Sequence, residues 1–111
     1  MYARIERFNM SQGLADLAAD LADKIEPIMR RQPGFQSLTL FSDETSGEYL
    51  ALTIWTTLEQ IHTYERSEDE WRVRDILSPY LTAIPQIEVY QVHNLPPAPV
   101  ATALPAEGAA S

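Results

Sequence analysis

The stretch FQSLTLFSDETSGEYLALTIW, residues 35–55, decides the fold. Residues 35–41 and 48–55 each have the length and composition of a strand. The residues between them, 42–47, are polar and turn-forming, and they end in Gly47. The two segments therefore predict an antiparallel hairpin.

A strand and a helix are predicted before this hairpin. Residues 2–8 have strand length and alternate in part between charged and uncharged side chains. Ser11 is a suitable helix N-cap, and Pro33-Gly34 terminates the helix that follows it. Pro27 lies inside the helical pattern and is expected to kink or end the helix near that point. The apolar residues at helical spacing are Leu14, Leu17, Ala18, Leu21, Ile25, Ile28 and Met29.

Two helices and a last strand are predicted after the hairpin. Thr57 and Ser67 each open a capping box, in which a hydroxyl and the side chain three residues later satisfy free backbone amides. The first helix is expected to end near Arg66, and Pro79 should tighten or bend the last turn of the second. Residues 87–93 predict the final strand. The second helix carries on one face Val73, Ile76, Leu77, Tyr80 and Leu81.

The order of elements is β-α-β-β-α-β, with the second helix broken in two. This order predicts an α+β, ferredoxin-like fold with a four-stranded antiparallel sheet and its helices on one face. Both faces of the strands carry apolar groups, since Leu50 and Leu52 alternate with Tyr49 and Ala51. A bare apolar sheet face needs a cover, so we expect a homodimer in which the open faces of two sheets meet.

The last part of the chain differs in composition. Residues 95–111 are rich in proline and alanine and have no apolar period. We interpret residues 1–94 as one folded domain and residues 95–111 as an irregular C-terminal tail.

Composition excludes several classes of protein. The 111 residues hold no cysteine, which rules out disulfides and thiolate metal sites. Eight basic residues against sixteen acidic ones give a net charge of −8, which disfavours binding to nucleic acid. No apolar stretch approaches the ~18 residues of a membrane span, so no membrane partner is expected. The charged N-terminus lacks the apolar core of a signal peptide, and we expect a cytoplasmic protein.

Several short segments together point to a known family. They are Arg31-Gln-Pro-Gly-Phe35, Ile54-Trp-Thr-Thr57 leading into Leu58-Glu-Gln-Ile-His62, Ser67 at a helix start, and Ile87-Glu-Val-Tyr-Gln-Val-His93. The arrangement resembles the antibiotic biosynthesis monooxygenase family of dimeric α/β-barrel proteins, over about residues 1–94. The resemblance implies a ferredoxin-like dimer with a pocket between sheet and helices. Some members oxidise polycyclic aromatic or quinol substrates with dioxygen, without metal or flavin, and others degrade heme.

The chain departs from both branches of that family. Of the Asn, Trp and His that the heme-degrading branch uses, only Trp55 is matched, and residues 71–75 hold no His. Heme chemistry is therefore not expected. The polyketide-oxidising branch pairs its Trp with an Asn four residues earlier and a Tyr six residues later. Those positions are Ala51 and Ile61 here, whereas the Arg on the following helix is matched by Arg74.

Three residues are the candidates for catalysis. Trp55 could hold a flat aromatic substrate by stacking, or it could be a core residue at a strand end. His62 could act as a base or stabilise an anion, or it could be a half-exposed surface residue. Arg74 could pair with an anionic substrate, although an ion pair with Glu70 one turn earlier explains it as well.

Four further residues are candidates for substrate binding. Tyr64 could donate a hydrogen bond to a substrate oxygen, or pack against the sheet. Trp71 could line a pocket or simply pack. Arg4 and Glu6 share one strand face, which is either a pocket wall or a solvated surface. No metal is expected, because the only two histidines, His62 and His93, lie on separate elements.

These residues and the resemblance predict a monooxygenase that needs no cofactor. Its substrate is expected to be a small aromatic or quinol-like compound, bound in the pocket between sheet and helices. The alternative is a non-catalytic dimer of the same fold, either a small-ligand-binding module or a structural one.

Overall fold

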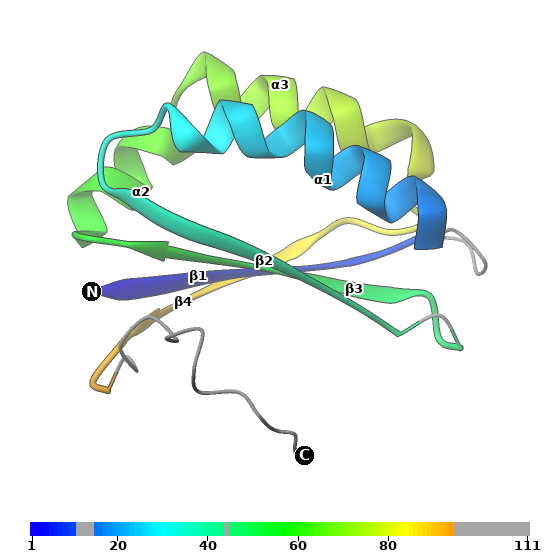
Figure 1. The fold of residues 1–111 in the computed structure, drawn as a ribbon, viewed down its shortest axis with the longest axis horizontal. Coiled ribbons are helices and arrows are strands. Elements are labelled where there is room, and N and C mark those ends of the chain that lie inside the picture. Colours follow the sequence, from blue (N-terminus) through cyan, green and yellow to red (C-terminus); the bar gives the residue numbers. More distant parts are fainter. Residues whose placement is uncertain (11–14, 44, 95–111) are drawn as a thin grey trace, which may run out of the picture.

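The computed structural model describes residues 1–10, 15–43 and 45–94. A four-stranded sheet lies beneath a layer of helices that covers one of its faces (Figure 1). The ferredoxin-like prediction is confirmed. The elements are β1 (Tyr2–Asn9), α1 (Ala15–Arg30), β2 (Phe35–Asp43), β3 (Glu48–Trp55), α2 (Leu58–Glu65), α3 (Glu68–Leu77), a 3-10 turn (Ser78–Tyr80) and β4 (Gln86–Gln91).

The strands lie in the order β2-β3-β1-β4, and every neighbouring pair is antiparallel. The predicted hairpin of β2 and β3 is therefore present, and β1 and β3 occupy the centre. Paired residues share a face of the sheet, so the register Arg4↔Thr53 and Glu6↔Ala51 places all four on one side. That side faces the helices.

The two predicted capping boxes have different outcomes. At Thr57 the box is complete, because its hydroxyl accepts from the Gln60 amide and the Gln60 side chain accepts from the Thr57 amide. At Ser67 only half of it forms. The Ser67 hydroxyl accepts from the Glu70 amide, whereas the Glu70 carboxylate pairs with Arg74.

Helix α1 continues through Pro27 to Arg30. Pro27 lies in the last turn and is exposed, and Asp23, whose carbonyl loses its helical donor, is also an exposed residue. The predicted N-cap Ser11 and Leu14 lie outside the described residues, as does the tail 95–111. Strand β4 ends at Gln91, so the predicted strand is two residues too long and His93 follows it.

The core lies between the helices and the inner face of the sheet. Its largest fully buried side chains are Trp55, Tyr49 and Ile61. Phe8 stacks on Tyr49 with 5.7 Å between ring centroids, which ties β1 to β3 on this face. None of the described helices is long and apolar enough to cross a membrane.

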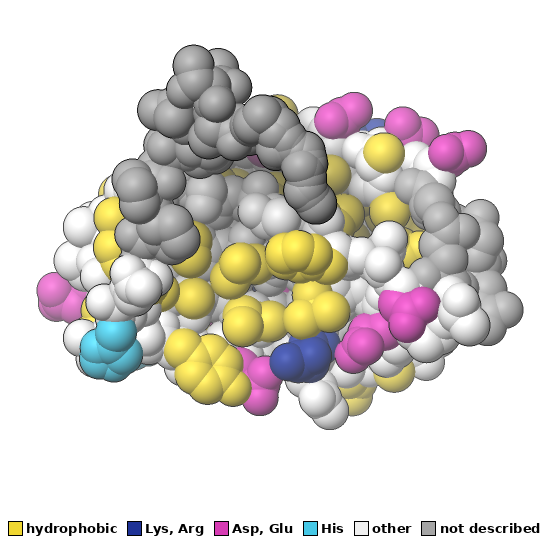
Figure 2. Space-filling view, turned by 60° about the horizontal axis from the view of Figure 1, so that its bottom comes forward, with side chains coloured by type: hydrophobic (Ala, Val, Ile, Leu, Met, Phe, Trp, Pro, Cys, Tyr) yellow, Lys and Arg dark blue, Asp and Glu magenta, His cyan; other side chains and the backbone are white. Residues whose placement is uncertain are grey.

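The other face of the sheet has no covering layer among the described elements. Figure 2 shows hydrophobic side chains gathered over its middle, beside basic and acidic ones. The alternation of the paired strands assigns Ile5, Leu50 and Leu52 to this face. Arg7 lies on the same face and pairs with Glu88 at 3.2 Å and Glu48 at 3.8 Å. The homodimer across this face stays a prediction.

Candidate functional site

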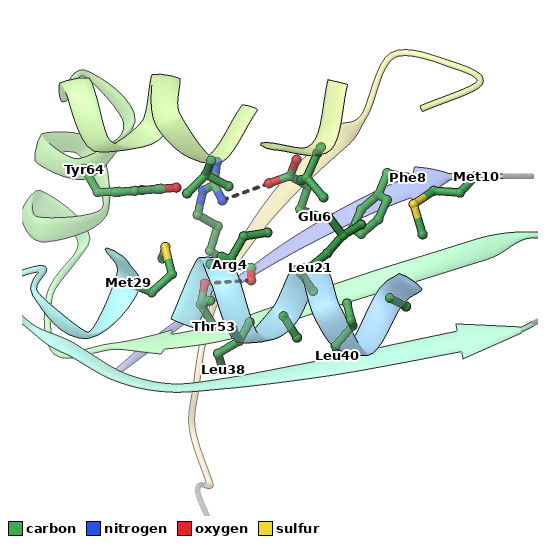
Figure 3. Close-up of a pocket in the computed structure, with 16 residues that line it drawn as sticks. Arg4, Glu6, Phe8, Met10, Leu21, Met29, Leu38, Leu40, Thr53 and Tyr64 are labelled. Atoms are coloured by element: carbon green, nitrogen blue, oxygen red, sulfur yellow. Dashed lines mark hydrogen bonds and ion pairs between the residues drawn. The ribbon is translucent and has the colours of Figure 1, made fainter. Parts of the chain in front are cut away.

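A cavity of about 50 Å³ lies between the sheet and helices α1 and α3 (Figure 3). Its walls are mainly apolar, and one part is polar. The half-buried lining residues Ala22, Ile25, Leu38 and Leu40 belong to α1 and the edge strand β2, so the cavity approaches solvent between these two elements. The apolar lining consists of Phe8, Met10, Ala18, Leu21, Ala22, Ile25, Met29, Leu38, Leu40, Ala51, Val73 and Leu77.

Four side chains make the polar part of the wall, which we call the polar corner: Arg4, Glu6, Thr53 and Tyr64. Arg4 and Glu6 are two residues apart on β1 and therefore point to the same face. Thr53 is the partner of Arg4 on β3. In Figure 3 the guanidinium of Arg4 lies between the Tyr64 hydroxyl, which comes from α2, and the carboxylate of Glu6.

Arg4 is the centre of the polar corner, and it is only 4% exposed. Its Nε donates to Glu65 Oε2 at 2.9 Å, and its Nη1 donates to Glu6 Oε1 at 3.3 Å. The guanidinium carbon lies 5.4 Å from the centroid of the Tyr64 ring, a cation–π distance. Within the described part of the chain, Nη2 of Arg4 has no hydrogen-bond partner.

The charge states of this corner follow from its surroundings. Burial opposes the charge on Arg4, but the hydrogen bond to Glu65 and the attraction of Glu6 outweigh it, so the pKa of Arg4 is raised. Burial also raises the pKa of Tyr64 well above its ordinary value. Arg4 is therefore charged and Tyr64 keeps its O–H at neutral pH.

Trp55, the first of the candidate catalytic residues, is fully buried in the core. Its Nε1 donates to the Thr53 hydroxyl at 2.9 Å. Its ring meets Phe35 edge-on at 5.8 Å and lies tilted against Tyr64 at 5.5 Å, measured between centroids. Trp55 is thus behind the polar corner and contacts two of its members, but it does not line the cavity.

The other candidates have separate locations. His62 is exposed on α2, and Trp71 is 68% exposed on α3. Arg74 pairs with Glu70, as the alternative interpretation had it. The structure does not bring Trp55, His62 and Arg74 together around the cavity, whereas Arg4, Glu6 and Tyr64 all line it.

Some residues of the site are not evident from the sequence. Thr53 is one, although the alternation of β3 offers a signal, because it is the only hydroxyl between Ala51 and Trp55 on the helix-facing side. From the sequence, the apolar residues of α1 and β2 are expected to be core residues, and nothing in their spacing indicates that they line a cavity. A cavity arises where such residues fail to meet, which depends on three-dimensional packing.

No group of three or more His, Asp or Glu side chains that could hold a metal occurs among residues 1–10, 15–43 and 45–94. The charged groups of the polar corner pair with one another instead.

The sequence matches the family model described as antibiotic biosynthesis monooxygenase over residues 1–72. None of the curated proteins matches it significantly.

Several solved structures share the fold. A Bordetella bronchiseptica protein provisionally assigned as an antibiotic biosynthesis monooxygenase is 18% identical, with a TM-score of 0.72 over 82% of this chain and 95% of that one. SnoaB, a cofactor-independent oxygenase from Streptomyces nogalater, is 16% identical, with a TM-score of 0.69 over 87% and 97%. The Mycobacterium tuberculosis protein Rv0793 is 20% identical, with a TM-score of 0.63 over 90% and 97%. At these identities the likeness shows the fold.

Proposed function

The chain belongs to the antibiotic biosynthesis monooxygenase family, and from this premise we propose that it oxygenates a small aromatic or quinol-like substrate in the cavity, without a cofactor. The observation that carries the proposal is an apolar cavity with a single polar corner, built around Arg4 and Glu6. SnoaB, which shares the fold, is a cofactor-independent oxygenase.

The apolar wall supports this chemistry because dioxygen is apolar and partitions into such space. A reaction of this kind also needs a substrate that can lose a proton and groups that stabilise the resulting anion. The polar corner offers both: the Glu6 carboxylate as proton acceptor, and Arg4 with the Tyr64 hydroxyl as donors to the substrate oxygen. The protein then supplies orientation and electrostatics, and the substrate supplies the electrons.

The overall reaction balances for a hydroquinone. One oxygen atom of O2 enters the ring, two hydrogens leave with the other oxygen atom as water, and a hydroxyquinone forms. The substrate gives up four electrons, which O2 accepts, so no external reductant is required.

Oxygen consumption tests the proposal. The rate with benzene-1,4-diol, corrected for the rate without protein, is compared between the wild type and Glu6→Gln. We expect kcat to fall about 10²–10⁴-fold, the usual contribution of a positioned base. The matched control is Glu68→Gln, whose side chain is 91% exposed at the start of α3 and should leave the rate unchanged.

Two results would decide against this assignment. Equal rates in the wild type and Glu6→Gln would remove Glu6 as the base. A loss confined to Trp55→Phe, His62→Ala and Arg74→Met would instead place the chemistry with the residues that the sequence favours. Ligand binding without oxygen uptake across hydroquinones and anthrones would support the non-catalytic alternative.

The proposal includes a homodimer through the open sheet face. Ile5, Leu50 and Leu52 form an apolar strip there, and Phe41 and Tyr90 are 50% and 52% exposed on the flanking strands. Burying such a strip against a second copy removes apolar surface from water. Arg7 would enter the interface already paired with two carboxylates, Glu48 and Glu88.

A further inference from the structure

One nitrogen of the Arg4 guanidinium, which lines the cavity, makes no hydrogen bond within the described residues. Nε and Nη1 are bonded to Glu65 and Glu6, but Nη2 has no partner within the described residues. The side chain is buried and lines the cavity. A buried donor without an acceptor is costly, and a ligand that brings an acceptor oxygen removes that cost.

The charges around Nη2 determine which acceptor is suitable. Arg4 faces two carboxylates, Glu6 and Glu65, and the neighbouring Glu70 and Arg74 neutralise each other. The polar corner and its surroundings therefore have one negative charge in excess. A ligand carboxylate would be the third beside Arg4, and it would be buried there without a counter-charge.

The size of the cavity limits the ligand further. One buried water needs roughly 10–15 Å³ on the scale on which this cavity measures about 50 Å³, so the space equals about four waters. One aromatic ring already exceeds that space, so a single ring fills the enclosed part and extends toward the open side between α1 and β2.

We propose that the cavity selects a neutral, single-ring aromatic compound with an acceptor oxygen, such as a phenol, a hydroquinone or an aryl ketone, which binds Nη2 of Arg4, and that it rejects aromatic carboxylates. This rests on the proposed function and narrows its substrate class. A neutral phenol that binds at Arg4 and passes its proton to Glu6 leaves the total charge of the corner unchanged. The anion forms in place, without an anion having to enter.

Binding of three compounds of similar shape tests the inference: acetophenone, benzoate and toluene, titrated by calorimetry into the full chain. Acetophenone is neutral with an acceptor oxygen, benzoate adds a charge, and toluene has no acceptor. We expect acetophenone to bind the wild type at least tenfold more tightly than benzoate. Benzoate binding as tightly as acetophenone would overturn the inference without any variant.

Two variants test whether Arg4 and the carboxylates beside it cause the selectivity for acetophenone over benzoate. Arg4→Lys keeps the positive charge but loses Nη2, so acetophenone should bind about tenfold more weakly while toluene is unaffected. Glu65→Gln keeps Arg4 and removes the excess negative charge, so benzoate should gain several-fold and acetophenone should not change. The assignment would be contradicted if a folded Arg4→Lys bound acetophenone with unchanged affinity. It would also be contradicted if Glu65→Gln bound benzoate no more tightly than the wild type does.

Binding and oxygen uptake can fail separately. If acetophenone binds with the expected dependence on Arg4 and no diol consumes oxygen, the ligand selectivity stands and the oxygenase proposal falls. If no compound of the three binds up to its solubility limit, the selectivity falls, and oxygen uptake with larger quinols still decides the activity.

Discussion

The indole of Trp55 donates a hydrogen bond to the hydroxyl of Thr53, two residues earlier on the same side of β3. Thr53 in turn donates to the backbone carbonyl of Arg4 at 3.2 Å. A side chain of the core is thereby connected to the strand that holds the polar corner. Trp55 acts on the cavity through Thr53 and Tyr64, which it contacts.

Trp55→Phe should destabilise the protein by about 2–3 kcal/mol. The change removes a buried hydrogen bond and leaves a void in the core. Urea unfolding followed by circular dichroism measures the loss. Trp71→Phe is the matched control, since Trp71 is 68% exposed, and it should cost less than about 0.5 kcal/mol. Equal losses in the two variants would show that the indole hydrogen bond and packing contribute nothing special.

Ala18→Leu should block the cavity and leave the fold intact. Ala18 lies on the buried side of α1 and lines the cavity, so a larger side chain enters the empty space rather than a packed core. We expect loss of acetophenone binding and a melting temperature within a few degrees of the wild type. Ala19→Leu, at an exposed position on the same helix, serves as the control and should bind normally. Unchanged binding in Ala18→Leu would place the ligand elsewhere.

Gly34→Ala should cost about 1–3 kcal/mol. Gly34 has a φ of 82°, a backbone angle that residues other than glycine rarely adopt. A Cβ there would lie 1.8 Å from Gln60 Oε1. That oxygen completes the capping box of α2. Unfolding of Gly34→Ala, Gln60→Ala and the double variant separates the two effects. The double variant should lose less than the sum of the single ones, and strict additivity would argue against the clash.

The capping boxes show how far local sequence predicts structure. Thr57 and Gln60 need only each other, and the box formed as expected. At Ser67 only half of the pattern forms, because the Ser67 amide already donates to the Tyr64 carbonyl at 2.9 Å and the Glu70 carboxylate pairs with Arg74. The local rule fails here because both groups of the expected hydrogen bond have other partners, which the four-residue pattern does not contain.

The sequence also predicts only part of the candidate site. The alternation of β1 placed Arg4 and Glu6 on one face, and they do line the cavity. The position of Trp55 was open, because the same face of β3 meets the cavity at Thr53 and the core at Trp55. Which of the two it meets depends on where α2 sets Tyr64, and no spacing in the sequence specifies that.

Protonation of Asp69 should account for part of the loss of folding stability at acid pH. A hydrogen bond from Gln32 at 2.6 Å, with further ones from Arg72 and Arg31, lowers the pKa of Asp69 below its ordinary value of 3.8. A lowered folded-state pKa contributes stability above the unfolded value, and that stability is lost as pH falls through the folded value. Asp69→Asn should therefore flatten the decline in the urea midpoint below about pH 4. Gln32→Met, which removes the first donor, should reduce the same slope, and an unaltered slope in both would exclude this link.

Leu52→Asp should convert the expected dimer to single subunits. Leu52 lies on the apolar strip of the open sheet face, and a charge there would have to be buried. Light scattering at micromolar concentration should give twice the chain mass for the wild type and once for the variant. Leu58→Asp, the same substitution at the exposed start of α2, should remain dimeric. A stable wild-type monomer would remove the dimer from the proposal.

The two tryptophans sit at opposite extremes of exposure, one sealed behind Tyr64 and the other open to water on α3. Replacing the outer one with phenylalanine leaves a single tryptophan, whose ring packs against Tyr64 of the cavity wall. We expect a molecule that shifts Tyr64 or binds Arg4 to change the wavelength or intensity of the tryptophan emission. The intrinsic fluorescence of Trp55 can therefore report whether the cavity is occupied, without an added label and at protein concentrations far below those that calorimetry needs.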